Sequence, residues 1–270
     1  GNITAAGSIT GGGAMTVVYG AVQLYSGAIT VDSLNIQDAT TSVTLNGAVT
    51  TQTTLDINSG GTLTQNKKVI AGTSLDYDAA TIGINNSIGA GSTVDIDATG
   101  GTIVAEAGDI TASGAVTFGA NKSGDLKTAG EVTTTDDDVT FTNMVTLQGN
   151  VAIDTGAGAG NILFSHKKDG DSTIATGDYN LTLDAGSAGN ITAAGSITGG
   201  GALTVVDGAV QLYSGAITVD SLNIQDATAS VTLDGAVTTQ TTLDINTLTG
   251  KLIQNAKVDA GSSLDYDAAG

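Results

Sequence analysis

Aspartates stand in the middle of short apolar triplets, at spacings that would stack them. Asp56, Asp76 and Asp95 lie in Leu-Asp-Ile, Leu-Asp-Tyr and Val-Asp-Ile, 20 and 19 residues apart. If these triplets form neighbouring parallel strands, their carboxylates lie about 4.8 Å apart and repel by roughly 0.9 kcal/mol per pair in water. Hard cations that bind oxygen ligands, calcium first, would relieve this repulsion.

The sequence therefore predicts a column of calcium-binding aspartates. Its members are Asp56, Asp76, Asp78, Asp95, Asp97, Asp244, Asp265 and Asp267. The alternative is a solvated column, or one twisted enough to separate the charges, in which Asp and Asn alternate without binding a metal ion. The Gly-Gly-x-Gly-x-Asp motif of calcium-binding toxin repeats does not occur, so any site here is of another kind.

The aspartate triplets belong to a series of apolar, mostly polar, apolar triplets that runs along the whole chain. The copies begin at Met15, Leu34, Leu55, Leu75, Val94, Val116, Val139, Ile162, Leu181, Leu203, Leu222, Leu243 and Leu264. A period of roughly 21 residues is typical of solenoids. Most repeats contain three short strand patterns, as in Leu203-Thr-Val, Ala209-Val-Gln-Leu and Ala216-Ile-Thr. We predict an all-β, three-sided parallel β-solenoid of about 13 coils, with about 21 residues in each coil.

Composition agrees with this fold class and excludes several kinds of partner. Pro, Cys and Trp are absent, and Gly, Thr, Ala, Asp and Val suit strands and tight turns. The formal net charge is −19, which repels nucleic acid and anionic lipid. No apolar run is long enough to span a membrane, so we expect neither a nucleic-acid partner nor a membrane span.

A larger repeat is superimposed on the coils. Residues 1–58 return at 189–246 with four substitutions: Met15 becomes Leu203, Tyr19 becomes Asp207, Thr41 becomes Ala229 and Asn46 becomes Asp234. We predict one continuous solenoid segment over 1–270, in which residues 1–188 are one large repeat and 189–270 are part of the next. Since neither end resembles a capping coil, we expect a segment of a longer protein.

Two polar stretches interrupt the coils and are expected to project as loops, at residues 119–138 and 165–178. The second contains the single histidine, His166, next to Lys167 and Lys168. A lone histidine without a nucleophile or metal-ligand partner predicts an ordinary surface residue.

Segments such as Gly189-Asn-Ile-Thr-Ala-Ala-Gly-Ser-Ile-Thr-Gly-Gly-Gly-Ala-Leu-Thr-Val and Tyr179-Asn-Leu-Thr-Leu-Asp-Ala-Gly resemble the giant bacterial surface proteins of the filamentous-haemagglutinin type and their β-strand-repeat relatives. The resemblance covers essentially the whole chain. It implies a right-handed parallel β-helix shaft, export across the outer membrane, and a role as an adhesin or extracellular fibre.

The function hypothesis is a structural shaft: a stiff acidic rod at the bacterial cell surface, without catalytic residues or a certain cofactor. Its expected partner is the protein itself, through end-to-end continuity or lateral association. One alternative is a module that binds surface glycans or host proteins through the two projecting loops. A less favoured alternative is a carbohydrate-active β-helix enzyme, which would place basic residues or paired carboxylates in a groove.

Overall fold

The computed structural model describes residues 2–24, 27–165, 174–212 and 215–268. Every regular element in these residues is a β-strand, and the strands stack in parallel as a β-solenoid of about 12 turns with roughly 20 residues per turn. The predicted fold class is therefore confirmed. The chain divides into an N-terminal unit, Gly1–Gly130, and a C-terminal unit, Glu131–Gly270, which are described separately below.

The N-terminal unit has three walls, each a parallel ladder of strands. Wall A contains β3 (Ala14–Val17), β6 (Ser33–Ala39), the first part of β9 (Leu55–Gln65), the first part of β11 (Leu75–Ile84), β13 (Val94–Ala98) and β16 (Val116–Phe118). Wall B contains β1 (Asn2–Ala5), β4 (Ala21–Leu24), β7 (Ser42–Leu45), the second parts of β9 and β11, β14 (Thr102–Val104) and β17 (Leu126–Thr128). Wall C contains β2 (Ile9–Thr10), β5 (Ile29–Val31), β8 (Val49–Thr51), β10 (Val69–Ala71), β12 (Ile88–Ala90) and β15 (Ile110–Ala112).

The C-terminal unit also has three walls. Wall D contains β18 (Val132–Thr133), β21 (Val151–Asp154), β24 (Leu181–Asp184), β27 (Ala202–Asp207), β30 (Ser221–Ala227), β33 (Thr242–Thr247) and β36 (Ser263–Ala268). Wall E contains β19 (Val139–Phe141), β22 (Ile162–Phe164), β25 (Asn190–Ala193), β28 (Ala209–Leu212), β31 (Val231–Leu233) and β34 (Leu252–Gln254). Wall F contains β20 (Val145–Leu147), β23 (Ile174–Gly177), β26 (Ile197–Gly199), β29 (Ile217–Val219), β32 (Val237–Thr239) and β35 (Val258–Ala260).

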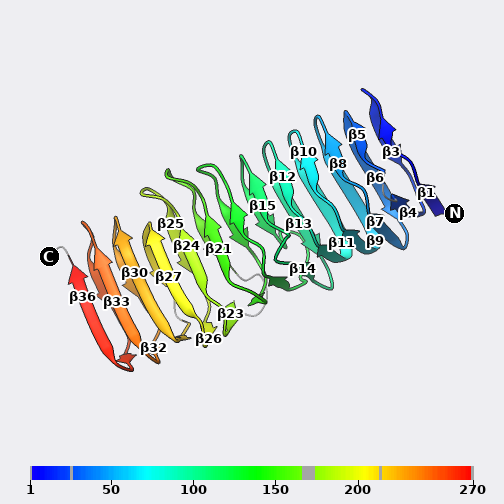
Figure 1. Ribbon diagram of the computed structural model, residues 1–270. Coiled ribbons are helices and arrows are strands. Elements are labelled where there is room, and N and C mark those ends of the chain that lie inside the picture. Colours follow the sequence, from blue (N-terminus) through cyan, green and yellow to red (C-terminus); the bar gives the residue numbers. More distant parts are fainter. Residues whose placement is uncertain (1, 25–26, 166–173, 213–214, 269–270) are drawn as a thin grey trace. The chain divides into compact units, whose positions relative to one another are not determined.

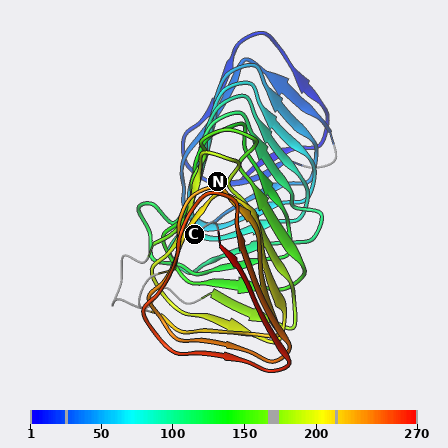
Figure 2. The same cartoon turned by 90° about the vertical axis from the view of Figure 1, so that its left-hand side faces the viewer.

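Figure 1 shows the strands of wall D from β24 to β36 running side by side, and Figure 2 shows the coils within each unit as successive turns around a common interior. Successive side chains point to opposite faces of each strand, so every second side chain enters the interior and the apolar ones fill it. In β4, for example, Val22 and Leu24 are buried while Gln23 lies between them on the outer side. On wall E the rings of Phe141 and Phe164 stack with their centroids 4.8 Å apart, so one side-chain type continues from one turn to the next.

The triplet series does not stay on one wall, which explains why the structure has fewer turns than predicted. The triplets at Val139 and Ile162 lie on wall E, whereas those from Leu181 onward lie on wall D. Ile162 pairs with Ile191, 29 residues further on, because nine residues separate the end of β22 from the start of β23. Leu181 therefore begins a different wall of the same turn. Wall A and wall E have six strands each, in agreement with about 12 turns.

Candidate functional site

The predicted aspartate column exists on wall A. Cross-strand register places Asp76 opposite Asp56 on one side and opposite Asp95 on the other. A second column, two residues further along each strand, places Asp78 between Asn58 and Asp97. The first column continues to Asn35 at one end and to Thr117 at the other. Five of the predicted calcium ligands are thus gathered on three neighbouring strands.

The other three predicted ligands form a smaller group on wall D of the C-terminal unit. Asp244 pairs with Asp265, and Asn246 pairs with Asp267. Asn223 precedes Asp244 on the neighbouring strand, as Asn35 precedes Asp56 on wall A. The 188-residue repeat therefore reproduces the beginning of the column, and each unit contains its own group of aspartates.

Protein groups neutralise part of the wall A column. The Lys122 ammonium lies 3.0 Å from the Asp78 carboxylate. The Asp97 side chain is only 1% exposed, and its Oδ2 accepts hydrogen bonds from the Asn121 backbone N–H at 3.0 Å and from the Asn121 side-chain amide at 2.8 Å. Asn121 and Lys122 belong to the stretch that the sequence predicts as a projecting loop. These two residues instead contact the wall and supply a charge and donors to the second column.

Protonation is a second way in which the repulsion between the carboxylates of wall A is reduced. Partial burial raises the pKa of Asp76, and the negative charges of neighbouring carboxylates raise it further, from 3.8 to about 6 in total. These carboxylates, in order of decreasing effect, belong to Asp78, Asp56, Asp95 and Asp97. Burial and the charge of Asp78 also raise the pKa of Asp56. A carboxylate that is costly to ionise takes up a proton at higher pH than usual, so the middle of the column loses its charge in mildly acidic solution.

Within the residues that the structure describes, no group of three or more acidic, histidine or cysteine side chains is arranged to hold a metal ion. Calcium binding by the eight aspartates stays a prediction. The wall places the carboxylates in the expected order, but Lys122 and Asn121 already occupy oxygens of Asp78 and Asp97, and an oxygen with such a partner is a poorer cation ligand.

Wall D contains a second set of stacked carboxylates, which the sequence analysis did not predict. Asp154, Asp184 and Asp207 line a cavity of about 400 Å³ together with Gly156, Ala157, Gly186 and Ser187. Each carboxylate accepts a hydrogen bond from a following glycine N–H: Gly156 at 2.7 Å, Gly186 at 3.0 Å and Gly208 at 2.7 Å. These glycines have positive φ angles of 87°, 63° and 116°. The repeated Asp-x-Gly or Asp-Gly pattern is the signal of these turns.

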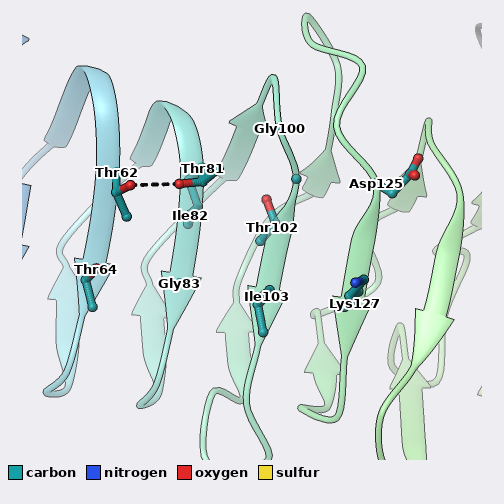
Figure 3. Close-up of a pocket in the computed structure, with 11 residues that line it drawn as sticks. Thr62, Thr64, Thr81, Ile82, Gly83, Gly100, Thr102, Ile103, Asp125 and Lys127 are labelled. Atoms are coloured by element: carbon teal, nitrogen blue, oxygen red, sulfur yellow. Dashed lines mark hydrogen bonds between the residues drawn. The ribbon is translucent and has the colours of Figure 1, made fainter. Parts of the chain in front are cut away.

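Wall B contains a pocket that the sequence did not indicate. It has a volume of about 360 Å³ and is lined from β9, β11, β14 and the start of β17. Figure 3 shows Thr62 and Thr81 joined by a hydrogen bond on one side of the pocket, with Asp125 and Lys127 on the other. Gly83 and Ile103 lie between them (Figure 3). The pocket therefore combines hydroxyl groups, an aliphatic surface and one charge of each sign.

His166 and residues 167–173 lie outside the described residues, so the prediction of an ordinary surface histidine is not addressed. Of the proposed second loop, Ser165 and residues 174–178 are described, and Ile174–Gly177 form β23 on wall F. No helix long and apolar enough to cross a membrane occurs in the described part of the chain.

Comparison of the chain with protein-family models, with curated proteins and with solved structures finds no match.

Proposed function

We propose that this chain is a structural shaft segment of an extracellular bacterial surface fibre or adhesin of the filamentous-haemagglutinin type. The observation that carries the proposal is the continuous parallel pairing of all three walls within each unit. Each turn uses its strand edges to bind the next turn, which is the geometry of a protein that extends by adding turns.

Polar ladders on the surface also support a structural role. Asn66 donates a side-chain hydrogen bond to Asn46 at 2.7 Å, and Asn85 donates to Asn66 at 2.8 Å. In the second large repeat, Asn255 donates to Asp234 at 2.6 Å. The exchange of Asn46 for Asp234 therefore keeps the acceptor that the next turn requires. The outer surface contributes to turn-to-turn cohesion, in addition to the core.

A lengthened protein tests the proposal. Since Gly189-Asn190-Ile191 repeats Gly1-Asn2-Ile3, a second copy of residues 1–188 can be placed before residue 1 with the natural junction. The longer chain is expected to fold with the same β-sheet circular dichroism. Its maximum dimension in small-angle X-ray scattering should increase by roughly 45 Å, from about nine turns of 4.8 Å.

The matched control carries an inserted copy that lacks ten residues at the junction, which shifts the register by about half a turn. This variant is expected to lose proteinase K resistance near the junction, whereas the 188-residue insertion keeps it. A 188-residue insertion that yields a compact particle, or one as protease-sensitive as the control, contradicts the shaft proposal.

The location is tested separately with antibodies raised against the chain. Labelling of intact source cells is the expected result, and labelling only after the cells are opened contradicts a surface location.

A further inference from the structure

The outward row at the centre of wall B changes character in the middle of the N-terminal unit. Strand register gives this row as Thr4, Gln23, Thr44, Thr64, Gly83, Ile103 and Lys127. The first four residues carry short or medium polar side chains. Gly83 then removes the side chain altogether, Ile103 introduces an aliphatic one, and Lys127 introduces a positive charge. The pocket lies where these departures from the repeat occur.

Gly83 makes the floor of the pocket. A Cβ atom added at this position would approach only the Leu63 carbonyl oxygen, at 4.0 Å, so the space above it is open. Ile103, on the next strand, is 50% exposed and forms one apolar side of the pocket (Figure 3). The glycine is therefore not required by close packing between turns, unlike most glycines at the corners of the solenoid.

The polar groups stand around this floor. The Thr62 and Thr81 hydroxyl oxygens are 2.9 Å apart, and the pair keeps donor and acceptor capacity for a third group. Asp125 and Lys127 flank the buried Leu126 and are both exposed. The Asp125 carbonyl accepts the Thr102 N–H at 2.9 Å, which fixes the backbone at the edge of the pocket. No ion pair within the described residues occupies the Lys127 ammonium or the Asp125 carboxylate.

We propose that this pocket binds a neutral pyranose sugar. The volume of about 360 Å³ lies within the range of small-molecule sites. A pyranose has hydroxyl groups that donate and accept hydrogen bonds around its edge and an aliphatic C–H face. These match the threonine hydroxyls and Lys127, and the Gly83–Ile103 floor. The net charge of −19 repels anionic ligands over the whole surface, so an uncharged sugar is favoured over an acidic one.

Saturation-transfer NMR with the intact chain tests the proposal. The probes are the methyl glycosides of glucose, galactose, mannose and N-acetylglucosamine, and glucuronic acid is the charged comparison. At least one neutral glycoside is expected to receive saturation and to bind more tightly than glucuronic acid. Lys127→Met should weaken binding several-fold, because it removes a charged partner from one hydroxyl.

Gly83→Val is the decisive variant because it places a branched side chain on the floor of the pocket, where an added Cβ approaches only the Leu63 carbonyl oxygen, at 4.0 Å. It is expected to lower the affinity roughly tenfold or more and to leave the melting temperature unchanged. The matched control is Gly89→Val, on wall C, where an added Cβ meets nothing within 4 Å. Gly89 also occupies the middle of a three-residue strand, and its variant should bind like the parent protein.

Three results would overturn the proposal: no saturation transfer to any neutral glycoside, tighter binding of glucuronic acid, or equal losses in Gly83→Val and Gly89→Val. The proposal goes beyond the shaft function and does not depend on it, since turn stacking is measured by scattering and protease resistance rather than by sugar binding.

Discussion

Asp76 shows how a repeated residue acquires an individual property from its position in a column. Carboxylates of Asp56 and Asp95 lie on both neighbouring strands, and Asp78 and Asp97 lie nearby. Lys122 neutralises Asp78 rather than Asp76. The middle carboxylate is therefore costly to ionise, and its titration affects the stability of wall A.

Stability is expected to decrease as the pH rises from about 4 to about 6. The pKa of Asp76 is raised in the folded state from 3.8 to about 6, so the folded protein binds this proton more tightly than the unfolded chain does. The resulting stabilisation is complete below the unfolded pKa and is lost as the pH rises through the folded pKa. Melting curves measured between pH 4 and pH 7 at constant ionic strength check this direction.

Asp76→Asn is expected to flatten this pH dependence and to raise stability at pH 7. Since Asp76 is only partly buried and still contacts solvent, solvent screening limits the gain to about 1 kcal/mol, or about 2–4 °C in melting temperature. Asp137→Asn, at an exposed position in the C-terminal unit, controls for the general loss of one negative charge. An Asp76→Asn variant that keeps the full pH dependence of the parent protein would contradict this account.

Gln65 is a second residue whose role depends on its surroundings. It is fully buried. Its side-chain amide donates to the carbonyls of Lys67, Asn86 and Ser87 at 3.1, 2.9 and 3.2 Å. Its side-chain oxygen accepts a hydrogen bond from the buried Tyr77 hydroxyl at 3.2 Å. The pair recurs in the second large repeat, where the Tyr266 hydroxyl donates to Gln254 at 3.0 Å.

Gln65→Leu is expected to destabilise the protein by about 2–3 kcal/mol, because buried polar groups lose their partner. Tyr77→Phe should cost about 1 kcal/mol, since it removes one of the four hydrogen bonds. Urea unfolding monitored by circular dichroism measures both changes. Gln52→Leu, at an exposed position, is the control. Equal effects of the Gln65 and Gln52 variants would show that the buried network does not stabilise the turns.

At the scale of elements, alternation along the chain predicts the strands well because each strand buries one face. The triplets from Met15 to Val116 all lie on wall A. The prediction was wrong in treating Ile162 and Leu181 as equivalent points of successive turns. Both triplets have the same apolar pattern, since all three walls bury similar residues. Because the turn that contains β22 and β23 is long, the triplet 19 residues after Ile162 lies on wall D, and the strand that pairs with Ile162 comes later, at Ile191.

The pocket and the contacts of Asn121 and Lys122 could not be predicted in the same way. Both depend on which residues become neighbours across turns of unequal length. Gly83 appears in the sequence as one of 39 glycines, and only strand register places it between Thr64 and Ile103. The aspartate column was predictable because its members occupy the same position in three consecutive, regular turns.

Glycine has two separate roles in these elements, and a pair of variants distinguishes them. A Cβ at Gly47 would overlap the Gly27 carbonyl of the preceding turn, whereas a Cβ at Gly89 meets nothing within 4 Å. Gly47→Ala is expected to destabilise the protein by about 1–3 kcal/mol because two backbones must separate. Gly89→Ala should have little effect. Thermal melting compares them, and equal stability of the two variants would rule out close approach as the reason for Gly47.

At the scale of the whole molecule, the charge of −19 and the stacking of turns oppose each other. Stacking repeats each acidic position at short intervals, so repulsion accumulates within a column, and only eight lysines are available to offset it. Mobile cations must therefore screen much of the remaining charge. This requirement does not depend on a formed metal site.

Monovalent salt is expected to stabilise the protein. Raising NaCl from about 10 mM to about 100 mM shortens the screening length from about 30 Å to about 10 Å, which weakens repulsion between carboxylates on neighbouring turns. The melting temperature at pH 7 should rise with salt, and it should rise less in the Asp76→Asn variant because one column then contains fewer charges. A melting temperature that falls with NaCl would show that favourable ion pairs, such as Lys122 with Asp78, outweigh the repulsion.

Calcium at matched ionic strength separates screening from binding. If the aspartates on walls A and D bind calcium, CaCl₂ should raise the melting temperature beyond NaCl, and a chelator should reverse the excess. Specific binding stabilises the folded state in proportion to the logarithm of free calcium once the site is saturated, whereas screening follows ionic strength alone. The triple variant Asp56→Asn, Asp76→Asn, Asp95→Asn should lose the excess from the N-terminal unit. Equal melting temperatures in CaCl₂ and NaCl would exclude the predicted calcium column and leave Lys122, Asn121 and protonation as the means of neutralising wall A.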